Sequence, residues 1–389
     1  MKRIRTLLAG SLLAAFAAGT ALAQTHGVSD TEIVIGATVP LSGNAASIGQ
    51  GWSIGARVAV DEVNAAGGIN GRKLKLVLED DGYVPAKTVQ NVRKLIDVDQ
   101  AFAILCTSSS AGTLSSIDYI TETGTILINT LVMNSQIWAT ERPTTFTIGQ
   151  GYPELTERVV SHMDQAEKDL KWGVFIQDDA FGENILTGVQ SALTKAGKEA
   201  TLVIKYKRGQ QDFSAEMARM KDAGVNAIYS GAVFNEHIVL TREAKRLNMP
   251  VKFGLLFTAH NALLQKMMGE PGQDALTADT VSTLAEDNGK KFIELASKHV
   301  SPKELEGVNR DSMTAYAGTS LLIDAIGRCG KDVTKDCVVK QLEETKDFAT
   351  LAMGPITFGP GVRFSNQPTR VLKNDFAAGA FVAVTDYQK

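Results

Sequence analysis

Residues 32–79 read EIVIGATVPLSGNAASIGQGWSIGARVAVDEVNAAGGINGRKLKLVLE, and three segments of this stretch differ in periodicity. Residues 32–39 form an almost unbroken apolar run, which is typical of a buried strand. Residues 46–66 carry apolar side chains at helical spacing and end at Gly67-Gly68, a common helix stop. Residues 73–79 alternate charged residues with leucines, as a half-buried strand does. The stretch therefore predicts a strand, a helix and a second, parallel strand joined by a right-handed crossover.

The same alternation continues along the chain. Further strands are predicted at 101–106, 125–129, 146–149, 172–177, 200–206, 227–231 and 251–257, with an extended piece at 278–283 and a strand-rich tail from 356. Further helices are predicted at 85–98, 110–123, 153–167, 182–196, 213–223, 235–247, 289–299, 312–327 and 334–346. Alternating strands and helices predict the α/β class, with parallel sheets covered by helices on both faces.

The length of 389 residues favours two lobes, because a single core rarely grows beyond about 250 to 300 residues. Helices in the C-terminal third have no strands of their own, so part of that region should return to the first lobe. We expect lobe 1 to contain residues 28–148 and 282–354, and lobe 2 to contain residues 149–281 and 355–389.

Composition excludes several classes of protein. With 44% apolar and 21% charged residues the chain is globular, and 40 basic against 43 acidic side chains, a net charge of −3, give no basic excess for a nucleic acid partner.

The N-terminus indicates export. Lys2, Arg3 and Arg5 precede an apolar run that ends in Ala21-Leu22-Ala23, which predicts a signal peptide over residues 1–23, cleaved after Ala23, and a periplasmic product. No later apolar run is long enough to span a bilayer, and no cysteine follows the cleavage site to carry a lipid.

Export permits disulfides, and the three cysteines are unevenly spaced. We predict a Cys329 to Cys337 bridge that staples a turn between two helices. Cys106 ends an apolar run without a nearby histidine, which favours a buried thiol over a catalytic one.

The string Gly51-Trp52-Ser53-Ile54-Gly55 matches the G-x-S-x-G motif of serine hydrolases, which would make Ser53 a nucleophile. That motif needs a sharp turn directly after a strand, whereas this string falls inside a predicted helix. A secreted serine hydrolase therefore remains the alternative from another class, and we expect no enzyme.

Other polar groups favour structural roles. The pairs Asp80-Asp81 and Asp178-Asp179 each close a strand, where caps are a simpler interpretation than a metal or sugar site. The scattered histidines share no metal-ligand spacing, and no dinucleotide turn follows the first strand, so we expect neither metal nor cofactor.

The string Cys106-Thr107-Ser108-Ser109-Ser110 places hydroxyl residues between a buried strand and the start of a helix. Unpaired amides and the helix dipole make such a turn an anion site, and ligands of open parallel sheets bind beyond the carboxyl ends of the strands. Simple capping of the helix by Thr107 to Ser109 is the competing interpretation.

A series of motifs resembles the leucine/isoleucine/valine-binding family of periplasmic receptors across nearly the whole mature chain. The motifs are Ile33-Val34-Ile35-Gly36, Pro40-Leu41-Ser42-Gly43, Asn64-Ala65-Ala66-Gly67-Gly68-Ile69-Asn70-Gly71, Asp80-Asp81, Cys106-Thr107-Ser108-Ser109, Asp178-Asp179-Ala180-Phe181-Gly182 and Tyr316-Ala317-Gly318. The resemblance implies a type I periplasmic binding fold: two Rossmann-like lobes with three crossings, a ligand between them, and delivery to an ABC importer permease.

The resemblance also implies where the ligand is held. The ligand carboxylate belongs at Thr107, Ser108 and Ser109 and at the loop Leu131 to Asn134, with Leu131, Met133 and Asn134 as candidate contacts. The aromatic residues that close the site correspond to Phe181 and Phe234. The relatives hold the amino group with a carboxylate, but the matching region, Gly254-Leu255-Leu256-Phe257-Thr258, contains no acid.

The missing acid at residues 254–258 affects which ligand the site is expected to bind. A site walled by Leu256, Phe257, Phe181 and Phe234 should reject an ammonium, because enclosing it without a partner costs several kcal/mol. Ile48 and Trp52 are further candidates for the wall, and Glu236 is a candidate for the missing charge.

We therefore expect a monomeric receptor that captures a small apolar or aromatic carboxylate, in a cleft whose one electrical feature is a cluster of backbone amides. Binding of branched-chain amino acids is the alternative, and transport is not distinguished from sensing through a membrane partner.

Overall fold

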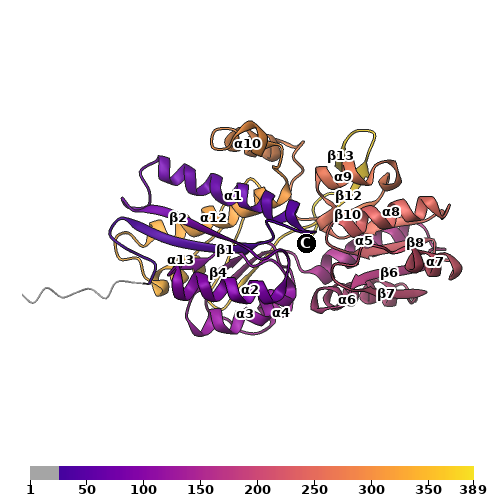
Figure 1. Cartoon of the computed structure of the whole chain (residues 1–389), viewed down its shortest axis with the longest axis horizontal. Coiled ribbons are helices and arrows are strands. Elements are labelled where there is room, and N and C mark those ends of the chain that lie inside the picture. The colour runs from indigo at the N-terminus through magenta and orange to yellow at the C-terminus, as the bar shows by residue number, and fades with distance from the viewer. Residues whose placement is uncertain (1–25) are drawn as a thin grey trace, which may run out of the picture.

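The structure is a computed structural model that describes residues 26–389, so the predicted signal peptide lies outside the described residues. Two α/β lobes lie end to end along the long axis, and the C-terminus lies between them (Figure 1). Each lobe is built on one sheet, as the strand and helix alternation predicts.

The first lobe is built on a parallel sheet with the strand order β11-β5-β4-β3-β1-β2. Its strands are β1 (Glu32–Val39), β2 (Lys73–Asp80), β3 (Ala103–Ile104), β4 (Ile126–Asn129), β5 (Thr145–Gly149) and β11 (Phe364–Asn366). Its helices are α1 (Ala46–Ala65), α2 (Pro85–Arg93) with the π-helical turn Lys94–Val98, α3 (Ser110–Glu122), α4 (Gln136–Ala139), α10 (Asp287–Ala296), α11 (Pro302–Leu305), α12 (Arg310–Arg328) and α13 (Lys335–Glu343).

The second lobe is built on a sheet with the order β13-β12-β10-β9-β8-β6-β7, in which only the pairings of β12 with β10 and β13 are antiparallel among the described strands. Its strands are β6 (Trp172–Gln177), β7 (Leu202–Tyr206), β8 (Ala227–Gly231), β9 (Lys252–Leu255), β10 (Leu276–Asp279), β12 (Arg370–Asp375) and β13 (Ala380–Ala383). Its helices are α5 (Tyr152–Ala166), α6 (Ala180–Lys195), α7 (Ser214–Asp222), α8 (Asn235–Arg246) and α9 (Ala262–Met268), with 3-10 turns at Phe257–Ala259 and Glu270–Gly272.

The chain passes between the sheets after β5, after β10 and between β11 and β12. The last passage, between β11 and β12, comes later in the chain than expected. Lobe 2 was expected to resume at residue 355, but Phe364–Asn366 pairs in parallel with β5 and so belongs to the first sheet. The ring of Phe364 stacks on Trp138 with centroids 4.1 Å apart, which fixes this short edge strand. Three residues are too few to show a strand period in the sequence.

The Gly51 to Gly55 string lies within α1, where it packs against the start of α12. The start of α12 packs so close to α1 that a Cβ on Gly55 would lie 1.8 Å from the backbone oxygen of Ser312. The Ser312 hydroxyl donates to the Gly51 carbonyl at 2.7 Å. Ser53 sits mid-helix and donates to the Gln50 carbonyl at 2.8 Å, so the string forms no nucleophile elbow.

The cysteines differ in state. Cys329, at the end of α12, and Cys337, in α13, form a disulfide. The thiol of Cys106 is free and fully buried, and burial raises its pKa well above the usual value. Between residues 26 and 389, no helix is both long and apolar enough to cross a membrane.

We predict that Gly55→Ala lowers the free energy of unfolding by about 2 kcal/mol, because an added methyl group forces α1 and α12 apart. Gly327→Ala is the matched control: it lies in α12, nothing lies within 4 Å of the added Cβ, and alanine should be neutral or stabilise the helix by up to about 1 kcal/mol. Urea unfolding followed by circular dichroism measures both variants. Equal stability of the two would contradict the close contact.

Candidate ligand-binding cleft

A cavity lies between the two lobes, at the edge of the first sheet where its parallel strands end. The first lobe contributes a serine cluster together with Pro40, Ile48, Tyr83 and Leu131, and the second lobe contributes Tyr152, Phe181, Val233, Phe257 and Thr258.

The serine cluster is the start of α3, and it consists of Ser108, Ser109 and Ser110. The Ser109 hydroxyl caps the helix by accepting a hydrogen bond from the Gly112 amide at 3.0 Å. The Ser110 hydroxyl is buried and has no hydrogen-bond partner among the described residues. The first amides of a helix also have no intrahelical partner, so this end of the cavity offers several hydrogen-bond donors to an anion.

A buried carboxylate lies behind Ser108. The Ser108 hydroxyl donates to Asp81 Oδ2 at 2.5 Å, Thr38 and Thr88 donate to the same oxygen, and the Tyr83 amide donates to Oδ1 at 2.9 Å. Because its hydrogen is committed to Asp81, Ser108 presents only oxygen lone pairs to the cavity. A ligand carboxylate would therefore bind at Ser110 and the helix amides rather than at the Ser108 hydroxyl.

Aromatic rings wall the rest of the cavity. Tyr152 packs edge-on against Phe181, with ring centroids 5.1 Å apart, and lies nearly parallel to Phe257 at 6.0 Å. Burial raises the pKa of Tyr83 to about 12, so its phenol is neutral. Sequence reasoning missed both tyrosines, although each follows the carboxyl end of a strand of the first sheet, where a ligand is expected.

Five of the ten residues predicted to contact a ligand line this cavity: Ser108, Ser109, Leu131, Phe181 and Phe257. The other five lie elsewhere. Thr107 hydrogen-bonds Thr113, and Asn134 donates to the Ala180 carbonyl. Met133 lines a smaller neighbouring cavity. Phe234 and Leu256 are buried in the core. Of the further wall candidates, Ile48 lines the cavity, whereas Trp52 is buried and donates to Thr130.

The cavity also contains an acid, so the expectation that backbone amides are its one electrical feature is wrong. Asp311, at the start of α12, lines the cavity and is only 4% exposed. Sequence reasoning missed it because Asp311 lies about 200 residues after the serine cluster and reaches the cleft only through the return of α12 to the first lobe.

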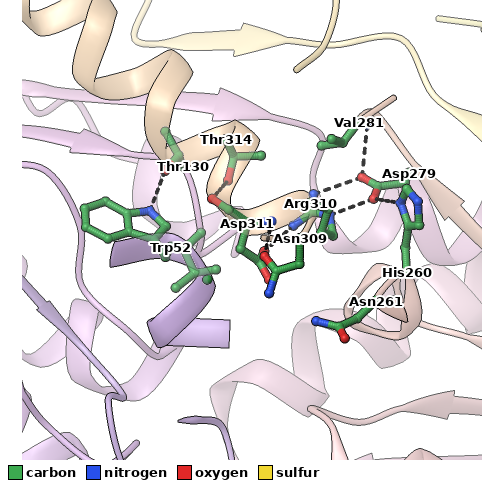
Figure 2. A network of polar contacts seen from close by, with 12 residues as sticks. Trp52, Thr130, His260, Asn261, Asp279, Val281, Asn309, Arg310, Asp311 and Thr314 are labelled. Atoms are coloured by element: carbon green, nitrogen blue, oxygen red, sulfur yellow. Dashed lines mark hydrogen bonds and ion pairs between the residues drawn. The ribbon is translucent and has the colours of Figure 1, made fainter. Parts of the chain in front are cut away.

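Asp311 belongs to a buried charge cluster that joins the lobes, and Figure 2 shows its members facing one another. Arg310 donates to both oxygens of Asp279 in β10, at 2.7 and 2.9 Å, and to Asp311 Oδ1 at 2.6 Å. His260 Nδ1 lies 2.7 Å from Asp279 Oδ2.

The pKa values of the two carboxyls move in opposite directions. Burial alone would raise the pKa of Asp279, but Arg310 and His260 outweigh burial and hold it well below its usual range. Burial raises the pKa of Asp311, and the single contact with Arg310 offsets only part of that effect. Asp311 is therefore the less compensated carboxylate of the cluster.

Contacts across the cleft surround the cavity. Glu236, the candidate for the missing charge, is 1% exposed and accepts from Asn44 of the first lobe at 2.9 Å and from the Phe234 amide at 3.1 Å, and it is not among the lining residues. Arg208 donates to the Tyr83 carbonyl at 2.9 Å and lies over the Tyr83 ring. The two lobes thus meet on the polar rim while the cavity between them stays mostly apolar.

Comparison with known proteins agrees with this architecture. The family model described as "Periplasmic binding protein" matches residues 32–379. The chain belongs to the periplasmic binding protein family. A curated relative, Leu/Ile/Val-binding protein homolog 2 of Brucella abortus, is 26% identical over 347 residues, which cover 87% of this chain and 89% of that protein. The resemblance deduced from the motifs is confirmed.

Solved structures of other proteins show the same fold. A branched-chain amino acid ABC transporter protein from Thermus thermophilus with bound valine superimposes with a TM-score of 0.84, at 17% identity over 93% of this chain and 97% of that one. An ABC transporter solute-binding protein from R. palustris in complex with 4-hydroxybenzoate gives a TM-score of 0.82, at 17% identity over 92% and 97%. The predicted type I periplasmic binding fold is confirmed.

Thr258, on the cavity wall of this periplasmic binding protein, is held by a buried histidine. His237 Nε2 lies 3.1 Å from the Thr258 hydroxyl and Nδ1 lies 3.0 Å from the Ser230 hydroxyl. Burial lowers the pKa of His237 to about 3, so the ring stays neutral in the folded protein at any physiological pH.

We predict that His237 makes the fold sensitive to acid. Below pH 6.5 the unfolded chain takes up a proton at this residue and the folded chain does not, so its contribution falls by about 1.4 kcal/mol per pH unit as the pH drops toward 3. The free energy of unfolding, measured with urea at pH 6.5 and at pH 5, should fall less between these two values for His237→Gln than for the native chain. An NMR titration in which the His237 ring takes up a proton near pH 6 would show the assignment to be wrong.

Proposed function

We propose that this protein is the periplasmic substrate-binding component of an ABC importer and captures a small carboxylate with an apolar or aromatic body between its lobes. One observation carries the proposal: a single cavity joins the unpartnered Ser110 hydroxyl at the start of α3 to the rings of Tyr152, Phe181 and Phe257.

The polar end of the cavity suits a carboxylate. The partial positive charge at a helix N-terminus and its free amides stabilise a nearby anion, and the Ser110 hydroxyl, which has the Tyr152 phenol as a neighbour, adds a further donor. The aromatic end suits an apolar body, because rings that lie against a ligand bury much of its surface. The two structural neighbours named above carry valine and 4-hydroxybenzoate, which share a carboxylate and differ in the rest.

Ligand capture would close the lobes by hinge bending at the three passages between the sheets. The contacts of Asn44 with Glu236 and of Arg208 with Tyr83 form across the cleft, so they stabilise the closed form and not the open one. The closed form is the one presented to a membrane permease. No bond is made or broken in this process, and Ser53, bonded within α1, takes no part in it.

We predict that small carboxylates stabilise the mature protein in a thermal-shift panel of L-leucine, L-phenylalanine, 4-methylpentanoate, 3-phenylpropanoate and 4-hydroxybenzoate. A ligand at 100 times its Kd adds about 2.7 kcal/mol to the stability, which is a shift of several degrees. Ester hydrolysis that disappears in Ser53→Ala would support the hydrolase instead. A panel without any shift would rule out carboxylate capture.

We predict that Ser110→Ala weakens binding of the best ligand in that panel about ten- to hundredfold, since a hydrogen bond to a charged group contributes about 1.5 to 3 kcal/mol. Ser116→Ala is the matched control, because this buried serine of the same helix donates only to the Gly112 carbonyl, at 2.8 Å, and should leave the Kd unchanged. Isothermal titration calorimetry gives both values. Equal effects of the two substitutions would remove Ser110 from the site.

A further inference from the structure

A two-residue turn between α1 and β2 consists of Asn70 and Gly71. Both residues have positive φ angles, 51° for Asn70 and 85° for Gly71. On either side of them, the backbones of Ile69 and Arg72 donate a hydrogen bond to each other. This geometry is typical of the type I′ turn, for which Asn-Gly is a favoured pair. Asn70 and Gly71 are both exposed, and nothing lies within 4 Å of a Cβ built on Gly71, so the turn is open to solvent.

The Asn70 side chain anchors this turn to the end of α12. Its Nδ2 donates to the Gly330 carbonyl at 2.7 Å and to the Gly327 carbonyl at 3.4 Å. Gly330 directly follows Cys329, which the disulfide to Cys337 holds in place. Both groups that face Nδ2 are acceptors, so this position requires a hydrogen-bond donor.

An asparagine that precedes a glycine has an intrinsic route of chemical change. The glycine backbone nitrogen attacks Cγ of the asparagine and loses its proton to a base in the solvent, while Nδ2 leaves as ammonia, which closes a succinimide ring. Water then opens the ring at either carbonyl and gives aspartate or isoaspartate. Glycine permits the attack because it has no side chain to obstruct it. The Gly71 amide makes no hydrogen bond to the described residues, so this nitrogen is free to react.

A second Asn-Gly pair, Asn288 and Gly289, lies in a different setting. Both residues belong to α10, where the helix restrains the main chain. Gly289 is buried, and a Cβ built on it would lie 2.4 Å from the Cα of Leu284. Attack on Cγ requires rotation of the main chain, which a packed helix resists more than an exposed turn does. A basic residue follows each pair, Arg72 or Lys290, so the local sequences are matched.

We propose that Asn70-Gly71 is a site of spontaneous deamidation, and that conversion of Asn70 releases this turn from the end of α12. The carboxylate of the product cannot donate, so it faces the carbonyl oxygens of Gly327 and Gly330 as a third acceptor. Isoaspartate also lengthens the main chain, which a two-residue turn does not accommodate. Either product removes a contact between segments 260 residues apart in the chain. This site lies outside the cavity, so the inference is independent of the proposed ligand.

The first test measures the rate of conversion at each pair on the mature chain kept at pH 8.5 and 37 °C. Peptide mapping by mass spectrometry detects the loss of the amide and separates aspartate from isoaspartate. In the folded protein Asn70 should be converted at least tenfold faster than Asn288, whereas in urea, where the fold restrains neither pair, the two rates should agree within about twofold. No conversion at Asn70, equal rates in the folded protein, or a difference of the same size in urea overturns the proposal.

The second test measures the release from α12 with Asn70→Asp, which imitates the aspartate product. Its melting temperature should be lower than that of the native chain by about 2 °C or more, because the buried side of the turn loses a donor. Asn288→Asp is the matched control, since an acidic residue in the first turn of a helix is favourable and should leave the melting temperature unchanged or raise it. If Asn70→Asp and the native chain melt at the same temperature, the proposed release is wrong.

Discussion

The guanidinium of Arg310 is the contact on which the arrangement of the two lobes depends. It is 7% exposed at the start of α12 in the first lobe, and it binds Asp279 at the end of β10 in the second. A buried charge is tolerated only where partners compensate for its lost hydration, so the two lobes must stay close enough to keep both bonds. The same guanidinium holds Asp311 at the cavity wall, so the junction between the lobes is connected to the cavity.

The cavity between the lobes lies where two helices start at one sheet edge. In a parallel sheet all strands end on the same side, and the helices that follow them begin there. Here α3 begins at the cavity after β3, and α12, which follows the return of the chain to the first lobe, begins at the same cavity. The first start supplies hydrogen-bond donors and the second supplies a carboxylate, while α5 and α6 bring Tyr152 and Phe181 from the opposite lobe.

Local motifs predicted some features and misled about others. The hydroxyl string at Thr107 to Ser110 predicted a helix start at a sheet edge, because capping residues and the strand before them are local signals. The Gly51 to Gly55 string has the composition of a catalytic motif, yet its glycines are needed because the Asn309 side chain lies against Gly51 and the α12 backbone at Ser312 lies against Gly55. A sequence pattern does not show which distant backbone a glycine faces, so the structural reason for this motif emerged only with the helix pair.

The sequence by itself determined the α/β class, the family, most of the order of strands and helices, and the hydroxyl turn that begins α3, because each depends on neighbours along the chain. The tertiary structure decided the rest. It placed β11 in the first sheet, committed Ser108 to Asp81, added Tyr83 and Tyr152 to the wall and brought Asp311 to the cavity. These features depend on contacts between segments far apart in the chain, and such contacts have no period or spacing in the sequence from which they can be predicted.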